Sequence, residues 1–361
     1  MIRTGTNRIA SATVIFLLVA TTALCEAQQV VFRTSMLESL LMPVSNNAVA
    51  TITVGQQQFI VSFLGIGPGK SFSDTLSGTM VLAPESGRWK YAAPVPGGAG
   101  RLAAVAVSIG ELAYVFGGYT VAEDGTEVST PWTHTFNPVS GKFRERAAMP
   151  VPVDDAVAVT YAERYIFLIS GWHDVGNVNL VQRYDTQTDT WRQATPVPGR
   201  AVFGHAGGIV GNRIVYCDGV AIRPHADKSR DYVANDECFI GIIDEQDSRR
   251  IDWRTIDAHP GAPRYRMAAV GVTDRQSVMF IGGTQNPYNF NGIGYDGRPS
   301  EPAADALLFD VNSLTWQRLR IAGTATMDHR GLVAYGDGWL TIGGMLSGQA
   351  VTDQVIRYTF Q

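Results

Sequence analysis

The feature that most constrains the fold of this chain is an internal repeat. Six segments each contain an apolar run that ends in a pair of small residues, usually with glycine, at a spacing of roughly 50 to 65 residues. The runs end at Gly65, Gly118, Gly171, Gly219, Gly283 and Gly344. A turn and a second apolar run precede each of them, so one structural unit recurs along the chain.

A second signature follows each small pair. A strand-like run leads into a turn rich in Asp, Asn, Ser and Gly, and a large aromatic residue then opens the next run. This place is held by Trp89, Phe143, Trp191, Trp253 and Trp316. Each unit therefore predicts four short strands, and no amphipathic segment of helix length interrupts them. Six such units in series predict an all-β fold, a six-bladed β-propeller.

The sixth unit is incomplete, because the chain ends at "VIRYTFQ" without a fourth strand. The segment "FRTSMLESLLMPVSN" near the N-terminus offers one, since it ends in the same Met-Pro-Val turn as the second unit. We expect this N-terminal strand to close the sixth blade, which leaves no open sheet edge. The alternative is an open array with an exposed edge.

The small pair, the later aromatic residue and the turn after it together resemble the kelch repeat over nearly the whole mature chain. The resemblance is strong in units two, three and five, whereas Asp218-Gly219 replaces the double glycine in unit four. Kelch units often carry an arginine and then a histidine before the first strand of a blade. By this resemblance Arg101 and Arg266 take the arginine place and His205 the histidine place, and the pair often bonds neighbouring blades.

The first 27 residues are typical of an export signal, with Arg3 and Arg8 before an apolar stretch and small residues near Ala27. We expect cleavage there, although an uncleaved membrane anchor is the alternative. The mature chain, residues 28–361, is then a single propeller domain without a membrane span, exported to the periplasm or secreted. In an oxidising compartment Cys217 and Cys238 are disulfide candidates, with free thiols as the alternative.

Functional residues are expected on one face of the propeller. The connections from the fourth strand of a blade to the next blade, and the loops between the second and third strands, emerge on the same face. Histidine and aspartate exchange protons near neutral pH, and arginine binds carboxylates through paired hydrogen bonds. The candidate catalytic residues are Asp155, His205 and His329. The candidate substrate-binding residues are Arg101, Arg223, Arg266, Arg330, His173, Asp174 and Tyr265.

This mixture of side chains suits a sugar-like ligand or glycan, including one with an anionic group. The size, export and repeat of the chain resemble the family of exported sialic-acid (N-acetylneuraminate) mutarotases, which implies exchange of sugar anomers by acid–base catalysis. The alternative is a non-catalytic module that binds a carbohydrate or a protein partner. A more remote alternative is a copper radical oxidase similar to galactose oxidase. That site needs a cysteine cross-linked to a tyrosine, and both mature cysteines here lie in one blade.

Several other classes are disfavoured. The formal net charge is −4 and the acidic and basic residues are interspersed, so the sequence offers no surface for nucleic acid. "LGIGPGKS" ends like a phosphate-binding loop, but Leu64 replaces its first glycine and a strand rather than a helix follows. The spacings typical of zinc sites are absent from the sequence. We therefore expect neither a metal nor a cofactor.

Overall fold

The computed structural model describes residues 1–2, 31–227 and 229–360. The predicted signal peptide, residues 1–27, lies outside these ranges except for its first two residues. Within them the regular elements are strands and three 3₁₀ helices, η1 (Phe72–Asp74), η2 (Thr273–Arg275) and η3 (Ser347–Gln349). None of the helices in the described ranges is long and apolar enough to cross a membrane.

The described strands form six blades of four antiparallel strands, here called blades 1 to 6. Blade 1 consists of β2 (Ala48–Val54), β3 (Gln57–Phe63), β4 (Thr79–Ala83) and β5 (Arg88–Ala92). Blade 2 consists of β6 (Val105–Ile109), β7 (Leu112–Phe116), β10 (Thr133–Asn137) and β11 (Lys142–Arg146). Blade 3 consists of β12 (Val157–Tyr161), β13 (Tyr165–Ile169), β16 (Val181–Asp185) and β17 (Thr190–Ala194). Blade 4 consists of β18 (Ala206–Val210), β19 (Arg213–Cys217), β22 (Cys238–Ile243) and β23 (Ile251–Ile256). Blade 5 consists of β24 (Ala268–Val272), β25 (Ser277–Ile281), β26 (Asp305–Asp310) and β27 (Thr315–Ala322). Blade 6 consists of β28 (Val333–Tyr335), β29 (Gly338–Ile342), β30 (Val355–Phe360) and β1 (Val31–Met36).

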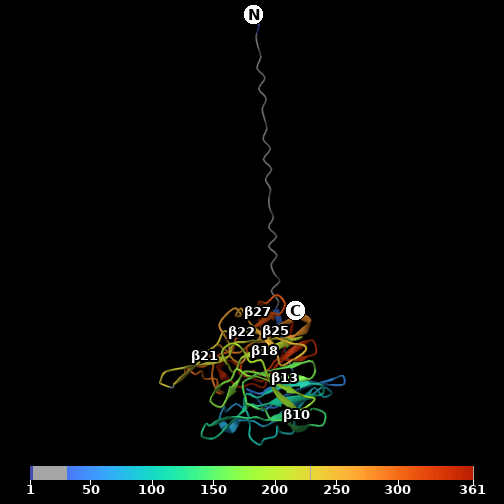
Figure 1. The fold of residues 1–361 in the computed structure, drawn as a ribbon. Helices are drawn as coiled ribbons and strands as arrows, with labels where there is room; N and C mark the ends of the chain where they lie inside the picture. Colours follow the sequence, from blue (N-terminus) through green and yellow to red (C-terminus); the bar gives the residue numbers. More distant parts are fainter. Residues whose placement is uncertain (3–30, 228, 361) are drawn as a thin grey trace.

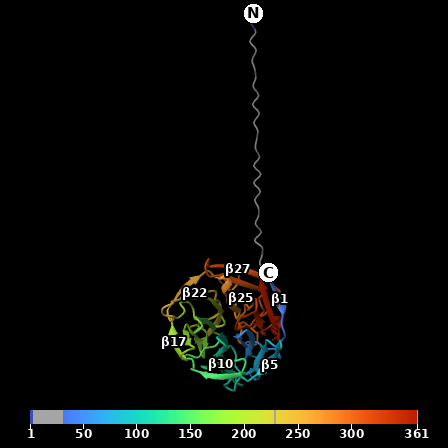
Figure 2. The same ribbon diagram turned by 90° about the vertical axis from the view of Figure 1, so that its right-hand side faces the viewer.

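The N-terminal strand closes the propeller, as the sequence predicts. β1 pairs antiparallel with β30, and Phe32 lies opposite Phe360. β1 also runs parallel to β27, where Val31 faces Arg320, so blades 5 and 6 share one sheet. Figure 2 shows the rounded outline, with β1, β5, β10, β17, β22 and β27 following one another around the rim. The first and last parts of the chain thereby meet and cover each other's edges.

The repeated tryptophan has a structural reason. In four blades its indole N–H donates a hydrogen bond to a backbone carbonyl in the segment that precedes that blade. The bonds run from Trp89 to Glu38, Trp191 to Ala147, Trp253 to Thr195, and Trp316 to Asp257, with lengths of 2.8 to 3.1 Å. Each tryptophan thus packs into the blade interface and also satisfies a carbonyl there, which makes it a tie between neighbours.

The repeated small pair is explained by backbone geometry. Both members of every pair have positive φ, for example 57° at Gly117 and 80° at Gly118. A Cβ atom at the second position would lie 2.6 Å from a carbonyl oxygen in both Gly118 and Gly171. That contact is closer than carbon and oxygen atoms can approach, so the second residue is glycine in all six blades. The first position tolerates Leu64, Ser170 and Asp218.

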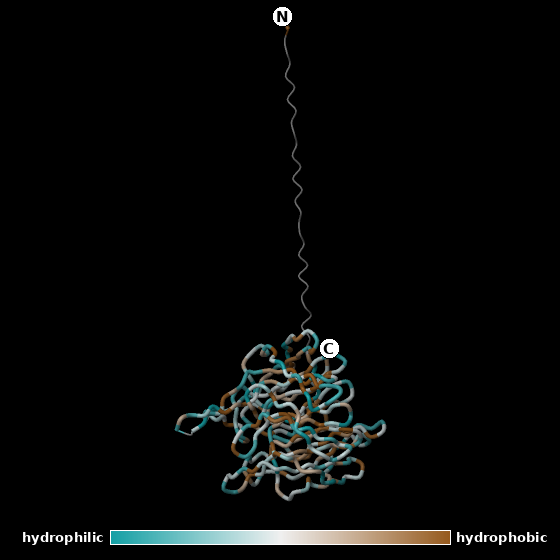
Figure 3. Tube along the Cα trace, viewed as in Figure 1, coloured by the Kyte–Doolittle hydropathy of each residue, from teal (hydrophilic) through white to brown (hydrophobic). Residues whose placement is uncertain are grey.

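Three loops between second and third strands carry hairpins of their own: β8 (Tyr119–Val121) with β9 (Glu127–Ser129), β14 (Trp172–His173) with β15 (Gly176–Asn177), and β20 (Val220–Pro224) with β21 (Arg230–Ala234). The β20–β21 hairpin projects from the body in Figure 1, and its tip is hydrophilic in Figure 3. Cys217 and Cys238 form a disulfide at its base, as predicted. A cross-link of this loop length is worth about 3 kcal/mol.

We predict that replacing Phe32 by alanine destabilises the whole propeller. Phe32 is fully buried, and its ring packs 4.5 Å from that of Phe360 between the two ends of the chain. Truncation of a buried phenylalanine costs about 3 to 5 kcal/mol of unfolding free energy.

Urea unfolding measures this cost. The matched control is Met36→Ala on the same strand, where the side chain is exposed and the expected change is within about 0.5 kcal/mol. Equal effects of the two substitutions would contradict closure by β1.

Candidate functional site

The connections between blades form a closed ring around the propeller axis on the face that carries the long loops, here called the upper face. One residue from each connection has positive φ: Asn46, Ala103, Asp155, Gly204, Arg266 and Asp328. The amide of Asp155 donates to the carbonyl of Ala103, and the amides of Gly204 and Arg266 donate to the carbonyls of Asp155 and Gly204, at 2.8 to 3.0 Å. The side chain of Asn46 completes the ring. Its Oδ1 accepts a hydrogen bond from the Ala103 amide, and its Nδ2 donates one to the Asp328 carboxylate.

Four charged side chains, here called the ion cluster, occupy the centre of this ring: Asp155, Arg266, Asp328 and Arg330. Arg266 binds both oxygens of Asp155, at 3.2 and 2.6 Å, and Asp328 at 2.9 Å. Arg330 reaches from blade 6 to within 2.9 Å of Asp155 in the opposite blade 3. All four side chains are at most 3% exposed. Two arginines balance two aspartates, and the neighbouring cations hold the pKa of Asp155 below its usual value despite burial.

The two candidate histidines occupy equivalent places beside the ring, and both side chains are buried. His205 Nε2 bonds the carbonyl of Ile169 in the preceding blade at 3.0 Å, and His329 Nε2 bonds the Thr326 hydroxyl at 2.9 Å. Burial lowers the pKa of each to about 4. Asn47, at the same place in blade 1, likewise donates to a carbonyl of the preceding blade. His205 therefore matches the inter-blade role that the kelch resemblance attaches to the histidine, whereas the bond of His329 lies within its own connection.

The arginine place of the repeat is filled by Arg101 and Arg264, not by Arg101 and Arg266 as the sequence suggests. Arg101 donates to the carbonyl of Gly117 at 2.6 Å, and Arg264 lies at the equivalent position of blade 5, donating to Gly282. Both are buried. Arg266 lies two residues further on, in the ring itself. Counted back from the small pair, Arg266 matches Arg101, but the turn between β24 and β25 (273–276) is two residues longer than that between β6 and β7 (110–111), which shifts the equivalent place to Arg264.

The other candidate residues are spread over the upper face. Tyr265 is buried beneath Arg266, whose guanidinium lies 4.5 Å from its ring centre. His173 and Asp174 lie on the β14–β15 hairpin and are partly exposed, with Nδ1 of the histidine 3.8 Å from the carboxylate. Arg223 pairs with Asp231 at 2.6 Å on the projecting hairpin, where both side chains are largely exposed. These residues do not converge on one point, whereas Asp155, Arg266 and Arg330 do.

A small cavity, here called the upper cavity, lies above the ion cluster among the loops of blades 2 to 5. Its volume is about 70 Å³, and it is open to solvent. Aromatic rings dominate the wall, and carboxyl and amide groups complete it. The lining residues are Tyr119, Glu127, Asp154, Asp155, Trp172, Phe203, Tyr232, Asn289 and Tyr295.

Two carboxyl groups in the upper cavity are electrostatically perturbed. Burial, followed by repulsion from Asp155, raises the pKa of Asp154 well above its ordinary value. Burial also raises the pKa of Glu127. Ser129, on the same strand as Glu127, donates to Asp154 at 2.7 Å, and Asn289 donates to Glu127 at 2.6 Å. Strand β9 and the blade-5 loop therefore fix both carboxyl groups.

Sequence reasoning did not select Glu127, Asp154 or Asn289 as site residues. Asp154 lies next to Asp155 in the connection before β12, and the signal that the sequence offered was this pair of adjacent aspartates. Glu127 and Asn289 come from long loops whose folded path the repeat does not encode. The structure brings them together with Trp172 and Tyr232, which the sequence does place on the same face.

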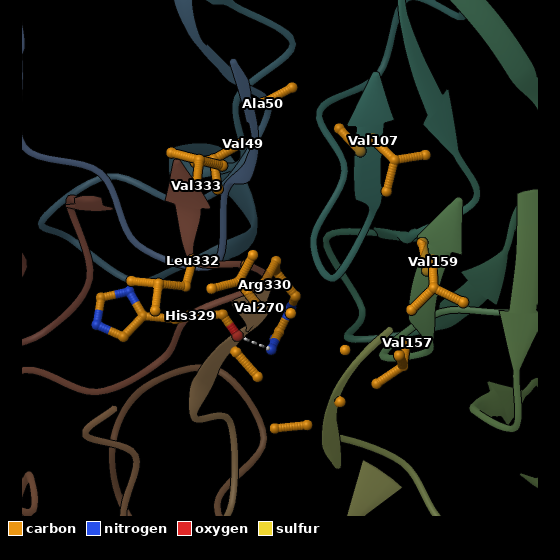
Figure 4. Close-up of a pocket in the computed structure, with 18 of the residues that line it drawn as sticks. Val49, Ala50, Val107, Val157, Val159, Val270, His329, Arg330, Leu332 and Val333 are labelled. Atoms are coloured by element: carbon orange, nitrogen blue, oxygen red, sulfur yellow. Dashed lines mark hydrogen bonds between the residues drawn. The ribbon is translucent and has the colours of Figure 1, made fainter. Parts of the chain in front are cut away.

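A second, larger cavity of about 270 Å³, here called the channel cavity, lies below the ion cluster and is lined by the first strands of the blades. Figure 4 shows Arg330 among Val157, Val270 and Leu332, with the ring of His329 directed away from Val157. Across residues 31–227 and 229–360, we find no cluster of three His, Cys, Asp or Glu side chains that could hold a metal ion.

Comparisons with known proteins agree with this architecture. The solved structure of YjhT superposes with a TM-score of 0.68 over 91% of this chain and all of its own, at 16% identity. Kelch domain-containing protein 3 of Rattus norvegicus is 26% identical over 244 residues, and its Homo sapiens counterpart is 26% identical over 245. The fold is a kelch β-propeller. Beta-scruin of Limulus polyphemus is 29% identical over 132 residues, which is 36% of this chain and 14% of that protein.

The Kelch domain-containing relatives align with 63% of this chain, and the chain spans 59% of their length. No family model matches the sequence. At 16% identity, the likeness to YjhT shows the fold alone.

We predict that Arg266→Gln destabilises the protein by about 3 to 5 kcal/mol, because it leaves Asp155 and Asp328 buried without their main counter-charge. The measurement is urea unfolding at neutral pH. Arg223→Gln is the matched control, since it breaks an exposed ion pair worth at most about 1 kcal/mol. A cost for Arg266→Gln as small as that of the control would contradict a structural role for the ion cluster.

Proposed function

We propose that this kelch propeller binds a reducing sugar in the upper cavity and interconverts its anomers by acid–base catalysis. The observation that carries the proposal is the pair of carboxyl groups, Glu127 and Asp154, with pKa values raised by burial in an aromatic cavity. Perturbed titratable groups in a cleft are typical of functional sites. We propose these two carboxyl groups in place of the candidate histidines, which are buried and have their Nε2 atoms hydrogen-bonded within the protein.

The walls of the upper cavity suit a sugar ring. Trp172 and Phe203 pack edge-to-face at 5.4 Å, and Tyr232 lies 6.0 Å from Trp172, so three aromatic rings form one connected wall. Aromatic faces pack against the C–H groups of a pyranose, while Glu127, Asp154 and Asn289 offer hydrogen bonds to its hydroxyls. The opening of the cavity to solvent leaves room for the remainder of the sugar outside it.

The two carboxyl groups can take complementary roles. Asp154, with the more strongly raised pKa, is the general acid in its protonated form, and ionised Glu127 is the general base. Glu127 takes the proton of the anomeric hydroxyl while the bond between the anomeric carbon and the ring oxygen breaks, and Asp154 protonates that oxygen. The open-chain carbonyl rotates and closes on its other face, and both protons return. The reaction needs no cofactor.

The charge around the cavity favours a neutral sugar over an anionic one. Arg266, next to the site, is already paired with Asp155 and Asp328. Arg230 lies over the rings of Trp172 and Tyr232 and donates to the Val175 carbonyl. A carboxylate ligand such as N-acetylneuraminate would have to displace one of these contacts and would meet ionised Glu127 as well. The sequence-based expectation of an anionic sugar is therefore refined here to a neutral hexose or N-acetylhexosamine. Export from the cytoplasm remains part of the proposal.

The test is exchange spectroscopy by NMR, which follows anomer interconversion of glucose, galactose, N-acetylglucosamine and N-acetylneuraminate with added protein. We predict acceleration for at least one neutral sugar, and a loss of about 100-fold or more in Asp154→Asn and Glu127→Gln. Glu163→Gln, an exposed carboxyl on the opposite face, is the matched control and should change nothing.

Calorimetric titration separates the alternatives. Binding of a sugar without accelerated anomer exchange would indicate a non-catalytic carbohydrate-binding module instead of an enzyme. Accelerated anomer interconversion of N-acetylneuraminate alone would favour an anionic sugar as the substrate. Neither binding nor exchange with any of the four sugars would overturn the proposal.

The pH dependence gives a further prediction. Because its pKa is raised above 4.5, Glu127 loses its proton, and the base becomes available, above the ordinary range for glutamate. The acid form of Asp154 persists above the ordinary range for aspartate, since burial and the neighbouring Asp155 raise its pKa well above the usual value. The exchange rate should therefore rise and then fall with pH, and Asp154→Asn should remove the alkaline limb. A rate that does not vary with pH would contradict these roles.

A further inference from the structure

The channel cavity is chemically unlike the upper cavity. Its walls are the first strands of the six blades, which contribute mainly valine, alanine and glycine together with Thr51, Ser108 and Thr160, while His205 and His329 lie at the end next to the ring. Residues near the ring, such as Ala156 and Met267, are buried, whereas Thr160 and Ala334 toward the other end are partly or fully exposed. The cavity is therefore an apolar pocket of about 270 Å³ that is closed by the ion cluster and opens on the lower face.

Two polar side chains that line the closed end lack a complete set of partners among the described residues: His205, at Nδ1, and Arg330. The side chain of Arg330 is 3% exposed, and its Nη1 donates to the carbonyl of His329 at 3.0 Å. Its Nη2 lies beside Asp155, but Nε has no hydrogen-bond acceptor among the residues that the structure describes. Figure 4 shows the guanidinium in the middle of the apolar wall residues. A buried N–H without an acceptor is costly, so an acceptor that enters the channel gains a bond there.

The charges near the channel disfavour an ionic ligand. The ion cluster contains two arginines and two aspartates, so its closed end has no net formal charge. The turns between first and second strands, which surround the open end, carry Glu111, Glu163, Asp274 and Asp337, of which Asp337 is paired with Arg357. Among the basic residues of these turns, Arg164 is paired with Asp185, and Arg275 covers the ring of Phe360. An anion would meet an acidic entrance, and a cation would meet Arg330 at the end.

We propose that the channel cavity binds an uncharged, largely apolar molecule with one hydrogen-bond acceptor, such as a ketone or an alcohol, whose oxygen accepts from Arg330 Nε. The apolar part would lie along the first strands, where burial from water drives binding. This site is independent of the proposed sugar site, because the ion cluster separates the two cavities and they face opposite sides of the ring.

The probe for this site is 6-propionyl-2-dimethylaminonaphthalene, an uncharged ketone whose fluorescence shifts to the blue in apolar surroundings. We expect a saturable blue shift with the wild-type protein. Octan-2-one should displace the probe at least ten times better than octane of the same chain length, because only the ketone accepts a hydrogen bond. Equal displacement by the two competitors would overturn the role of Arg330.

Two variants complete the test. Arg330→Met should weaken binding of the probe about tenfold and abolish the preference for octan-2-one. Thr160→Trp narrows the wall nearer the open end and leaves the ion cluster intact, so it should block the probe while the melting temperature and sugar exchange stay unchanged. A wild-type protein that gives no saturable shift, or a Thr160→Trp variant that binds as the wild type does, would overturn the site.

Discussion

The hydrogen-bonded ring on the upper face is the constraint on which the rest of the structure depends. Each connection between blades places one residue in the left-handed region, and in three of them its amide donates to the carbonyl of the preceding connection, as in the bond from Asp155 to Ala103. The small pairs follow from this, because the backbone of the second strand passes so close that only glycine fits at positions such as Gly118. With the ring in place, the inter-blade tryptophans and the closing strand β1 hold the outside of the disc.

The ion cluster uses this ring as a support. Buried ion pairs often contribute little net stability, because the cost of desolvating both charges offsets their attraction. Removal of one partner is nevertheless costly, since it leaves the other charge buried without a counter-charge. Here Arg266 binds Asp155 and Asp328 at once, and Arg330 approaches from the opposite blade. The channel is thereby divided into an aromatic, acidic cavity above and an apolar cavity below. One propeller thus contains two cavities of different chemistry.

Much of the fold could be predicted from the sequence, because its determinants are local and repeated. The small pairs, the aromatic residue at Trp191 and its equivalents, and the missing strand of the last unit each fix one feature of a blade. The disulfide follows because Cys217 ends one strand and Cys238 begins its neighbour. The candidate site was predicted less well. Sequence placed the correct loops on one face, but it could not tell Arg264 from Arg266 or recognise the part played by Glu127.

The sequence by itself determined the six blades, their closure and the face on which the polar loops gather. These depend on short-range periodicity and on steric requirements of single residues, which a repeat displays six times. Only the tertiary structure decided which polar side chains are paired with other protein groups and which line a cavity. His205 is engaged by the preceding blade, and Arg266 by two aspartates, while burial raises the pKa of Asp154. Such outcomes depend on distances and burial between blades far apart in the chain, so local sequence does not encode them.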